Sequence, residues 1–238
     1  MSVSPTRSAF WRGAREALPF ILVVAPFGLL FGVVATEAGF NLAETMAMTV
    51  LVIAGASQFA AVQMMADNAP ALVVLATALA VNLRMAMYSA ALSPHLGRAP
   101  VWQRALIAYA LLDQCYALAA QEYELRPDQS GAQKVAYFFG ASLAVCPWWY
   151  AMTLVGATLG EAIPPAFALD FAVPITFLAM VAPMLRTLAH VVSALVSVIA
   201  ALLLAWMPHN TGLMVAGLAA MVAGAQTELW QARRSAAR

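Results

Sequence analysis

Polar side chains interrupt several long apolar stretches of this sequence, at positions where they could bind a substrate or carry a proton. Moving a polar group from water into hydrocarbon is costly, so each such group is expected to serve a transport pathway or a contact between helices. They fall into three groups along the chain: Gly55-Ala56-Ser57-Gln58, Asn82 with Arg84, and Asp113.

The first group combines small and polar residues in the middle of the stretch 45–66. An interrupted helix exposes N–H groups and the positive end of its dipole, and an amino-acid carboxylate would fit there. The alternative is structural, with Ser57 and Gln58 bonded to a neighbouring helix across a small-residue contact. The candidates for substrate binding are Gly55, Ala56, Ser57, Gln58, Phe59 and Asn82.

Arg84 and Asp113 are the candidates for an ion pair or a proton carrier. Arg84 lies eight residues before Leu92, where its stretch ends, which is about 12 Å along a helix and too deep for easy contact with water. Asp113 interrupts another apolar stretch and is the expected partner of Arg84. A buried carboxylate can carry protons, and a structural ion pair between two helices is the alternative.

The composition predicts that membrane helices position these residues. Of the 238 residues, 63% are hydrophobic and 10% are charged, and the mean hydropathy is +0.82. Soluble domains carry about 25% charged residues. Because a chain in hydrocarbon must bond all of its backbone polar groups internally, we predict an all-α integral membrane protein. The formal net charge of +1, spread over short loops and both termini, excludes nucleic-acid binding.

Eight apolar stretches predict a single polytopic membrane domain, 1–238, with about six to eight transmembrane helices. The stretches are 17–36, 45–66, 68–92, 105–120, 135–160, 171–185, 187–207 and 211–227. Short connections leave no room for a soluble domain. The second stretch contains Gly55 and the sixth contains Pro174 and Pro183, so we expect both to be broken or re-entrant.

Lys and Arg residues predict the orientation, because they favour the cytoplasmic side. With six full crossings, the N-terminus, the loop with Arg98 and Arg104, Arg186 and the C-terminus lie in the cytoplasm, and Lys134 lies outside. The same scheme gives two inverted halves, 17–120 and 135–227, as in many secondary transporters. A weak echo supports the repeat, since Gly32, Glu37 and Ala38 recur at one common offset as Gly156, Glu161 and Ala162.

Other polar residues have simpler interpretations. Glu37 and Glu44 flank a predicted loop and are expected to be solvated helix ends. The three histidines are scattered, without the spacing of a metal site, so neither a metal nor a cofactor is expected. Cys115 and Cys146 lie in apolar stretches, which indicates packing rather than a disulfide.

Several motifs resemble the AzlC-type family of branched-chain amino acid permeases, over roughly residues 10–225. They are Leu18-Pro19-Phe20 with Gly28 and Phe31-Gly32, Ala54-Gly55-Ala56-Ser57-Gln58-Phe59-Ala60, Asn82-Leu83-Arg84 with Tyr88, Leu112-Asp113, and Asn210 with Gly212. Many members of that family have Asp-Glu where this chain has Asp113-Gln114. Any role of the second carboxylate therefore does not carry over.

The resemblance implies export of branched-chain amino acids such as valine, with methionine as a further candidate. It implies a multi-pass protein of the bacterial inner membrane that is not an enzyme, that acts with a small AzlD-type membrane subunit, and whose oligomeric state is open. Phe20, Phe31 and Phe59 are candidates for the apolar wall of the substrate pocket. The carboxylate would meet the N–H groups near Ser57, and the ammonium would meet broken-helix carbonyls or Asp113.

Two other functions stay open. A Gly-x-Ser motif in a membrane helix with a later histidine resembles an intramembrane serine protease, with Ser57 and His190 as the dyad. Gln58 beside the serine and the place of His190 near a helix end argue against it. The chain could instead be a non-transporting scaffold subunit, although a scaffold has little reason to bury Arg84 and Asp113.

Overall fold

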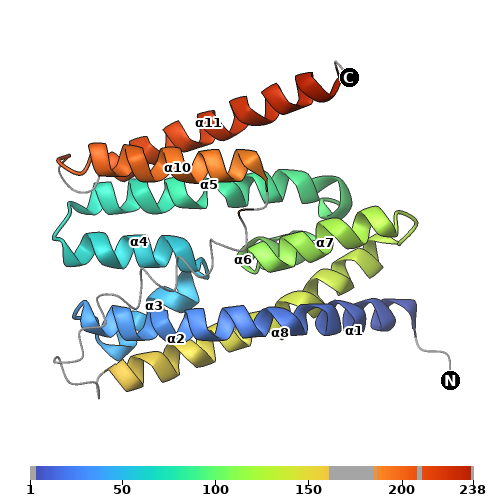
Figure 1. The fold of residues 1–238 in the computed structure, drawn as a ribbon. Helices are drawn as coiled ribbons and strands as arrows, with labels where there is room; N and C mark the ends of the chain where they lie inside the picture. Colours follow the sequence, from blue (N-terminus) through green and yellow to red (C-terminus); the bar gives the residue numbers. More distant parts are fainter. Residues whose placement is uncertain (1–3, 161–184, 186, 208–210, 237–238) are drawn as a thin grey trace. The chain divides into compact units, whose positions relative to one another are not determined.

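The computed structural model describes residues 4–160, 185, 187–207 and 211–236, and all regular structure in this part of the chain is helical (Figure 1). The predicted all-α class is therefore confirmed. In chain order the elements are α1 (Pro5–Ala17), the 3-10 helix η1 (Leu18–Phe20), α2 (Ile21–Glu37), α3 (Leu42–Leu51), α4 (Gly55–Ala66), α5 (Ala71–Leu96), α6 (Val101–Tyr109), α7 (Asp113–Leu125), α8 (Gly131–Gly160), α10 (Leu188–Leu203) and α11 (Thr211–Ala236).

Four helical segments are long and apolar enough to cross a membrane. They are Pro5–Glu37, Ala71–Leu96, Gly131–Gly160 and Thr211–Arg234, with 33, 26, 30 and 24 residues, where about 20 suffice. The first segment begins well before the predicted stretch 17–36, because α1 and η1 lead directly into α2. The prediction of an integral membrane protein is confirmed, and the number of full crossings stays a prediction.

The described chain folds into two compact units. The first unit holds the residues up to Val62 and those from Val81 to Gly160. The second unit holds the residues from Gln63 to Ala80 together with helices α10 and α11. In the second unit α10 and α11 are antiparallel, since Gly212 lies against Leu204 and Gly224 against Ser193. The candidate functional residues lie in the first unit.

The second apolar stretch is broken, as predicted, and forms a hairpin of α3 and α4. α3 ends at Leu51, Val52 is non-helical with φ −130° and ψ 86°, and α4 starts at Gly55. The β-branched pair Val52 and Ile53 favours extended backbone at this point. With 10 and 12 residues, the two helices measure about 15 and 18 Å, so neither alone spans about 30 Å of hydrocarbon.

The α3–α4 hairpin enters the first unit from the end at which α2 terminates. A four-residue connection, 38–41, joins α2 to α3. Along α4, Gly55 lies against Phe27, and the ring of Phe59 lies 4.9 Å from that of Phe27 and 5.4 Å from that of Phe31. Residue numbers in α4 and α2 therefore rise together, which means that α4 runs back towards the end from which α3 came.

The fourth apolar stretch also forms a hairpin, so 105–120 is not the single helix that the predicted orientation requires. α6 ends at Tyr109, Leu112 is extended with φ −85° and ψ 158°, and α7 starts at Asp113. The helices have 9 and 13 residues and are too short to span alone. No Gly or Pro marks this break, so it could not be predicted from the local sequence.

The α6–α7 hairpin enters from the end at which α5 terminates. The connection 97–100 joins α5 to α6. On the return, Asp113 pairs with Arg84, Tyr116 stacks on Tyr88, and Tyr123 lies against His95. Residue numbers in α5 and α7 rise together, and α7 therefore returns to the end of α5.

Lys134 marks a second correction. Its Nζ lies 3.2 Å from His95 Nδ1, in the last turn of α5, so it lies at the same end of the unit as Arg98 rather than on the opposite side. The cause is the hairpin, because a chain that turns back leaves the next residues on the side from which it entered. The sixth stretch, with its two prolines, and Arg186 lie outside the described residues.

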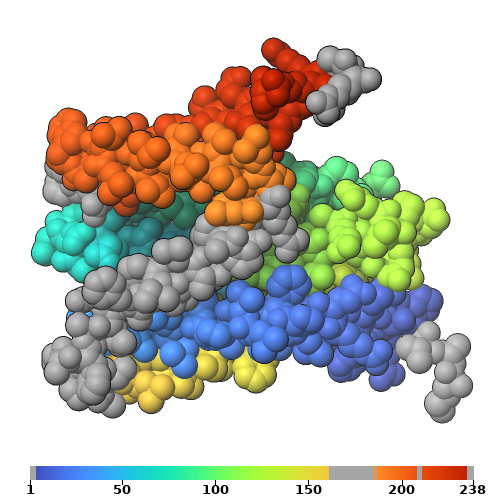
Figure 2. Space-filling view, viewed as in Figure 1, coloured from blue at the N-terminus to red at the C-terminus, as the bar shows by residue number. Residues whose placement is uncertain are grey.

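Glycines bring α1 and α2 into backbone contact with α8. A Cβ on Gly13 would lie 2.2 Å from the carbonyl oxygen of Tyr137, and one on Gly32 would lie 2.2 Å from that of Thr153. Both distances are shorter than a van der Waals contact, so only glycine fits. In Figure 2 the two helices form a continuous blue band along one face, and outward side chains such as Leu22, 81% exposed, suit contact with lipid.

These contacts also fix a direction, since residue numbers rise together along α2 and α8 and the two helices run the same way. The predicted halves 17–120 and 135–227 would make the first and fifth stretches antiparallel, which does not fit this arrangement. Within the first unit, the elements that run in opposite directions are instead the α3–α4 hairpin and the α6–α7 hairpin, because they enter from opposite ends.

Candidate functional site

The tips of the two hairpins meet within the first unit, at a point that is exposed. Tyr109, the last residue of α6, donates its hydroxyl to the carbonyl oxygen of Val50 in α3 at 2.5 Å. The same hydroxyl lies 2.7 Å from that of Tyr150 in α8. Val50 is in the last turn of α3, where backbone carbonyls lack a partner within the helix. Tyr109 therefore links the ends of both broken segments.

The residues predicted to bind substrate form the start of α4. Ser57 Oγ donates to the Ala54 carbonyl at 2.9 Å and accepts from Nδ2 of Asn82 in α5 at 3.0 Å. Gln58 Oε1 accepts from the backbone N–H of Ala54 at 3.2 Å. Ser57 is 1% exposed and Gln58 is 0% exposed. The structure thus joins Ser57, Gln58 and Asn82 around the break that precedes Gly55.

Two buried polar atoms in this group lack a hydrogen-bond partner among the described residues. They are Nε2 of Gln58, a donor, and Oδ1 of Asn82, an acceptor. Buried polar atoms are nearly always bonded, and an unbonded one costs about 1–3 kcal/mol. A donor and an acceptor are thus left open beside the start of α4.

Gly55 and Phe59 have a clear packing role. A Cβ on Gly55 would lie 2.8 Å from the ring of Phe27 and 2.9 Å from that of Trp149. The rings of Phe27, Phe31, Phe59 and Trp149 form a buried aromatic cluster. No ring contact joins Phe20, in η1, to this cluster in the described structure. A substrate role for Gly55, Ala56 and Phe59 stays a prediction.

Arg84 and Asp113 form the ion pair expected from the sequence. Arg84 Nη1 lies 3.0 Å from Asp113 Oδ2, and the two side chains are 34% and 41% exposed. Asp113 is the first residue of α7, where a negative charge favours the helix dipole. The pair is open to its surroundings, and its role as a proton carrier stays a prediction.

The ion pair is separate from the group at the start of α4. Asn82 and Arg84 are two residues apart on α5, about 200° around the helix, so they leave it on opposite sides. Asn82 turns to α4, and Arg84 turns to α7. The idea that one amino acid touches both Ser57 and Asp113 is therefore not supported by this geometry.

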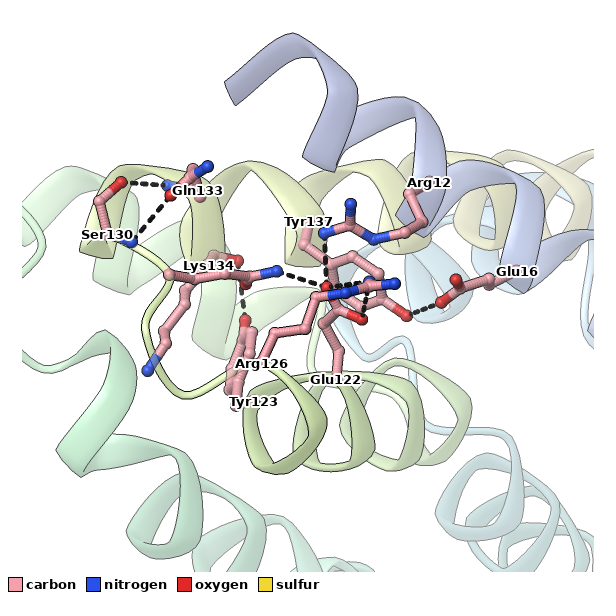
Figure 3. Close-up of polar contacts among 10 residues, drawn as sticks. Arg12, Glu16, Glu122, Tyr123, Arg126, Ser130, Gln133, Lys134 and Tyr137 are labelled. Atoms are coloured by element: carbon pink, nitrogen blue, oxygen red, sulfur yellow. Dashed lines mark hydrogen bonds and ion pairs between the residues drawn. The ribbon is translucent and has the colours of Figure 1, made fainter. Parts of the chain in front are cut away.

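A polar cluster around Glu122 was not predicted, because this residue lies after the fourth apolar stretch and no motif marks it. Figure 3 shows that Arg12 from α1 and Arg126 at the end of α7 converge on the Glu122 carboxylate. Arg12 Nη2 lies 2.5 Å and Arg126 Nη1 2.7 Å from it, and Gln129 Nε2 also donates to it at 2.5 Å. Glu122 is only 3% exposed. The cluster fixes the base of the α6–α7 hairpin to α1.

The charge of Glu122 is held by its partners. Burial by itself raises the pKa of this carboxyl, but hydrogen bonds from Arg126, Gln129 and Arg12 outweigh burial, so the pKa lies below its ordinary value. Nearby, the Tyr137 hydroxyl donates to Glu16 and the Tyr123 hydroxyl to the Lys134 carbonyl (Figure 3). The site is an anchor rather than a reactive centre, since every oxygen of Glu122 is bonded.

The contacts of Ser57 argue against a serine protease. Its hydroxyl bonds to Ala54 and Asn82, and no histidine contacts it within the described structure. His190, at the start of α10, is exposed, and its backbone N–H donates to Thr187, which caps that helix. Glu44 likewise has a structural role, because it forms a capping box with Asn41 at the start of α3.

Comparison with known proteins gives one family and several membrane proteins. The family described as AzlC protein matches residues 19–163. The chain is 27% identical over 237 residues to the inner membrane protein YgaZ of Escherichia coli (strain K12), which covers 96% of this chain and 93% of that protein. An uncharacterized membrane protein of Helicobacter pylori (strain J99) is 24% identical, over 64% of this chain and 66% of that protein. One of Archaeoglobus fulgidus is 27% identical, over 77% of this chain and 80% of that protein. No solved structure matches the chain.

Proposed function

Because the chain belongs to the AzlC family, a family of membrane transporters, we propose that it exports branched-chain amino acids such as valine across the bacterial inner membrane. Methionine is a further candidate substrate. In this proposal the chain is the large subunit of a complex with a small AzlD-type membrane protein. Its long apolar helices and its membrane-protein relatives support the location in a bilayer.

The observation that carries the proposal is the open donor and acceptor at the start of α4. An amino acid presents a carboxylate, which accepts hydrogen bonds, and an ammonium, which donates them. Gln58 Nε2 can donate to the carboxylate beside the N–H groups of the first turn of α4, and Asn82 Oδ1 can accept from the ammonium. The two open atoms thus match the two charged ends of an amino acid.

The surroundings of this group suit an apolar side chain. Gly55 packs directly against the rings of Phe27 and Trp149, so the aromatic cluster lies next to the proposed carboxylate site. Pockets for small ligands combine mostly apolar walls with a few polar groups that fix orientation. A branched aliphatic side chain would rest on these rings, whereas a charged side chain would be left without a partner.

Access requires movement of a hairpin. Ser57 and Gln58 are almost completely buried, so a substrate reaches them only when α3 and α4 shift from their present positions. A scaffold subunit would not need such a group, because open polar atoms inside a membrane protein cost stability without any gain in assembly.

The experiment that tests the proposal is efflux of radiolabelled valine from proteoliposomes that contain the chain with and without its small partner. Gln58→Ala is the test variant, and Gln63→Ala is the matched control, because Gln63 is exposed on the same helix. We expect saturable efflux with both subunits, retained in Gln63→Ala and reduced at least about tenfold in Gln58→Ala, since one buried hydrogen bond to a charged group is worth about 1.5–3 kcal/mol.

The outcomes separate the parts of the proposal. Efflux by this chain alone would overturn the two-component assembly but not the substrate. Absence of valine flux with both subunits would show that valine is not the substrate. An equal loss of efflux in both glutamine variants would show that the substrate does not bind at Gln58. The thermal unfolding midpoint of each variant shows whether Gln58→Ala still folds.

A further inference from the structure

A cavity of about 650 Å³ lies at the end of the first unit where α5 terminates. It is bounded by the first turns of α1 and α8 and by the connection from α5 to α6. We call it the basic cavity. Its apolar wall includes Phe10, Leu96 and Phe139, and its polar wall includes His95, Arg98 and Gln103.

The charge of the basic cavity is positive. Arg98 lines it, whereas none of the residues lining it is an Asp or a Glu. Lys134 is buried behind it, with its ammonium 3.2 Å from Nδ1 of His95 and 5.6 Å from the centre of the Tyr123 ring. Neither cation makes an ion pair with a carboxylate among the described residues. Glu124 acts on His95 electrostatically from nearby, but it forms no ion pair with Arg98 or Lys134. A cation in a concave, largely apolar site attracts an anion.

The place of the cavity indicates which leaflet it faces. Several Lys and Arg residues of the first unit lie at this end, namely Arg7 in the first turn of α1, Arg98 in the α5–α6 connection, and Arg126 and Lys134 on either side of the α7–α8 connection. Arg12 and Arg15 follow later in α1, and Arg104 lies in α6. The excess of Lys and Arg assigns this end to the cytoplasmic side, where the leaflet carries anionic lipids. The apolar wall is of no use to a small soluble anion, but it suits an acyl chain.

We propose that the basic cavity binds an anionic phospholipid of the cytoplasmic leaflet. The phosphodiester of the head group binds the Arg98 guanidinium and the Gln103 amide, and an acyl chain packs along Phe10 and Phe139. A lipid in this position contacts α1, the α5–α6 connection and α8 together. It therefore stabilises the base of the α6–α7 hairpin, on the side where the Glu122 cluster also holds it. Lipid binding of this kind does not depend on which substrate the protein carries.

The test is native mass spectrometry of the purified full chain after exposure to an equal mixture of phosphatidylglycerol and phosphatidylcholine. We expect phosphatidylglycerol to be retained preferentially, and Arg98→Gln to lower its retention about fivefold, since one cation near an anionic lipid surface is worth about 1 kcal/mol. Ala132→Trp, which fills the cavity without changing a charge, is expected to lower retention as well. Arg234→Gln, exposed on α11, is the control and is expected to have no effect.

Three results would overturn the proposal. Equal retention of the two lipids, or unchanged retention in both Arg98→Gln and Ala132→Trp, would exclude a site for anionic lipid in this cavity. Displacement of phosphatidylglycerol by inorganic phosphate at the same concentration would show a site for a soluble anion instead. The unfolding midpoint in phosphatidylcholine micelles, expected to be equal for wild type and Arg98→Gln, separates lost binding from lost folding.

Discussion

Asp113 sits at the start of a helix, beside an arginine, on a side chain that is 41% exposed. A pair as exposed as this contributes about 0–1 kcal/mol to stability where it is not enclosed by the protein. A gain in stability this small does not by itself account for two opposite charges in apolar stretches, and a role in transport stays a prediction. The sequence predicted the partners, since Arg84 was too deep to reach water and Asp113 was the carboxylate in a neighbouring stretch.

Asp113→Asn tests whether this carboxyl carries the proton that drives export. We expect the variant to fold with at most about 1 kcal/mol less stability and to lose the dependence of valine efflux on an imposed pH gradient. Glu124→Gln, an exposed carboxyl on the same helix, is the control. A pH-gradient dependence that survives in Asp113→Asn would exclude the proton role.

Gly156 tests the close contact between α2 and α8. A Cβ at this position would lie 1.9 Å from the Leu29 carbonyl oxygen, whereas one on Gly217 in α11 would meet nothing within 4 Å. We expect Gly156→Ala to lower the free energy of unfolding by about 1–3 kcal/mol through overpacking. Gly217→Ala is expected to raise it by about 0.5–1 kcal/mol, because alanine favours the helix. Thermal unfolding in detergent compares the two, and equal effects would contradict the contact.

At the scale of the elements, the two hairpins differ in how well the sequence predicts them. Gly55, in the middle of its stretch, predicted the first break. The second, at Ala110-Leu111-Leu112, consists of good helix formers, and its cause is tertiary. Tyr109 bonds to Val50 on one side of the break and Asp113 to Arg84 on the other. Contacts between residues so far apart in sequence leave no local pattern.

Glu122 gives the α6–α7 hairpin a dependence on pH. Its folded pKa lies below the ordinary value, so its contribution to stability is complete above the pKa of the unfolded chain and is lost as the pH falls through the folded pKa. Glu122→Gln removes the charge and leaves Arg12 and Arg126 without an anionic partner. We expect it to lower stability at pH 7 by about 2–4 kcal/mol and to flatten the loss of stability in acid.

Unfolding midpoints measured from pH 7 to pH 4 check this expectation, with Glu124→Gln as the exposed control on the same helix. If Glu122→Gln loses stability in acid as steeply as the wild type, another carboxyl carries the effect. The cluster itself could not be read from the sequence, because a buried carboxylate in a polar segment looks the same as a solvated one until its partners from α1 are placed.

At the scale of the whole molecule, the class of fold was predictable and the path of the chain was not. Composition and stretch length are sums over many residues, so the prediction of membrane helices tolerates local error. Orientation depends on whether each stretch crosses, and one unrecognised hairpin, 105–120, moved Lys134 to the wrong side. With that correction, the Lys and Arg residues near the ends of the first unit lie at one end, as the positive-inside rule requires.

This orientation can be tested with two single cysteines. Asp128→Cys lies in the α7–α8 connection and Ala43→Cys at the start of α3, and both positions are exposed. In intact cells we expect a membrane-impermeant maleimide to label Ala43→Cys at once and Asp128→Cys only after the membrane is permeabilised. Labelling of both positions from one side would contradict the arrangement of the hairpins. The reverse labelling pattern would show that the protein has the opposite orientation in the membrane.

Two hairpins that enter from opposite ends have a consequence for leakage. Gln58 is fully buried, so it becomes accessible only if α3–α4 moves, and movement of both hairpins together would uncover the interior of the unit from both ends. The hydroxyl of Tyr109 touches the end of α3 while it is fixed to the end of α6. One hydroxyl therefore joins the two tips, so a shift of either hairpin away from the other breaks this bond.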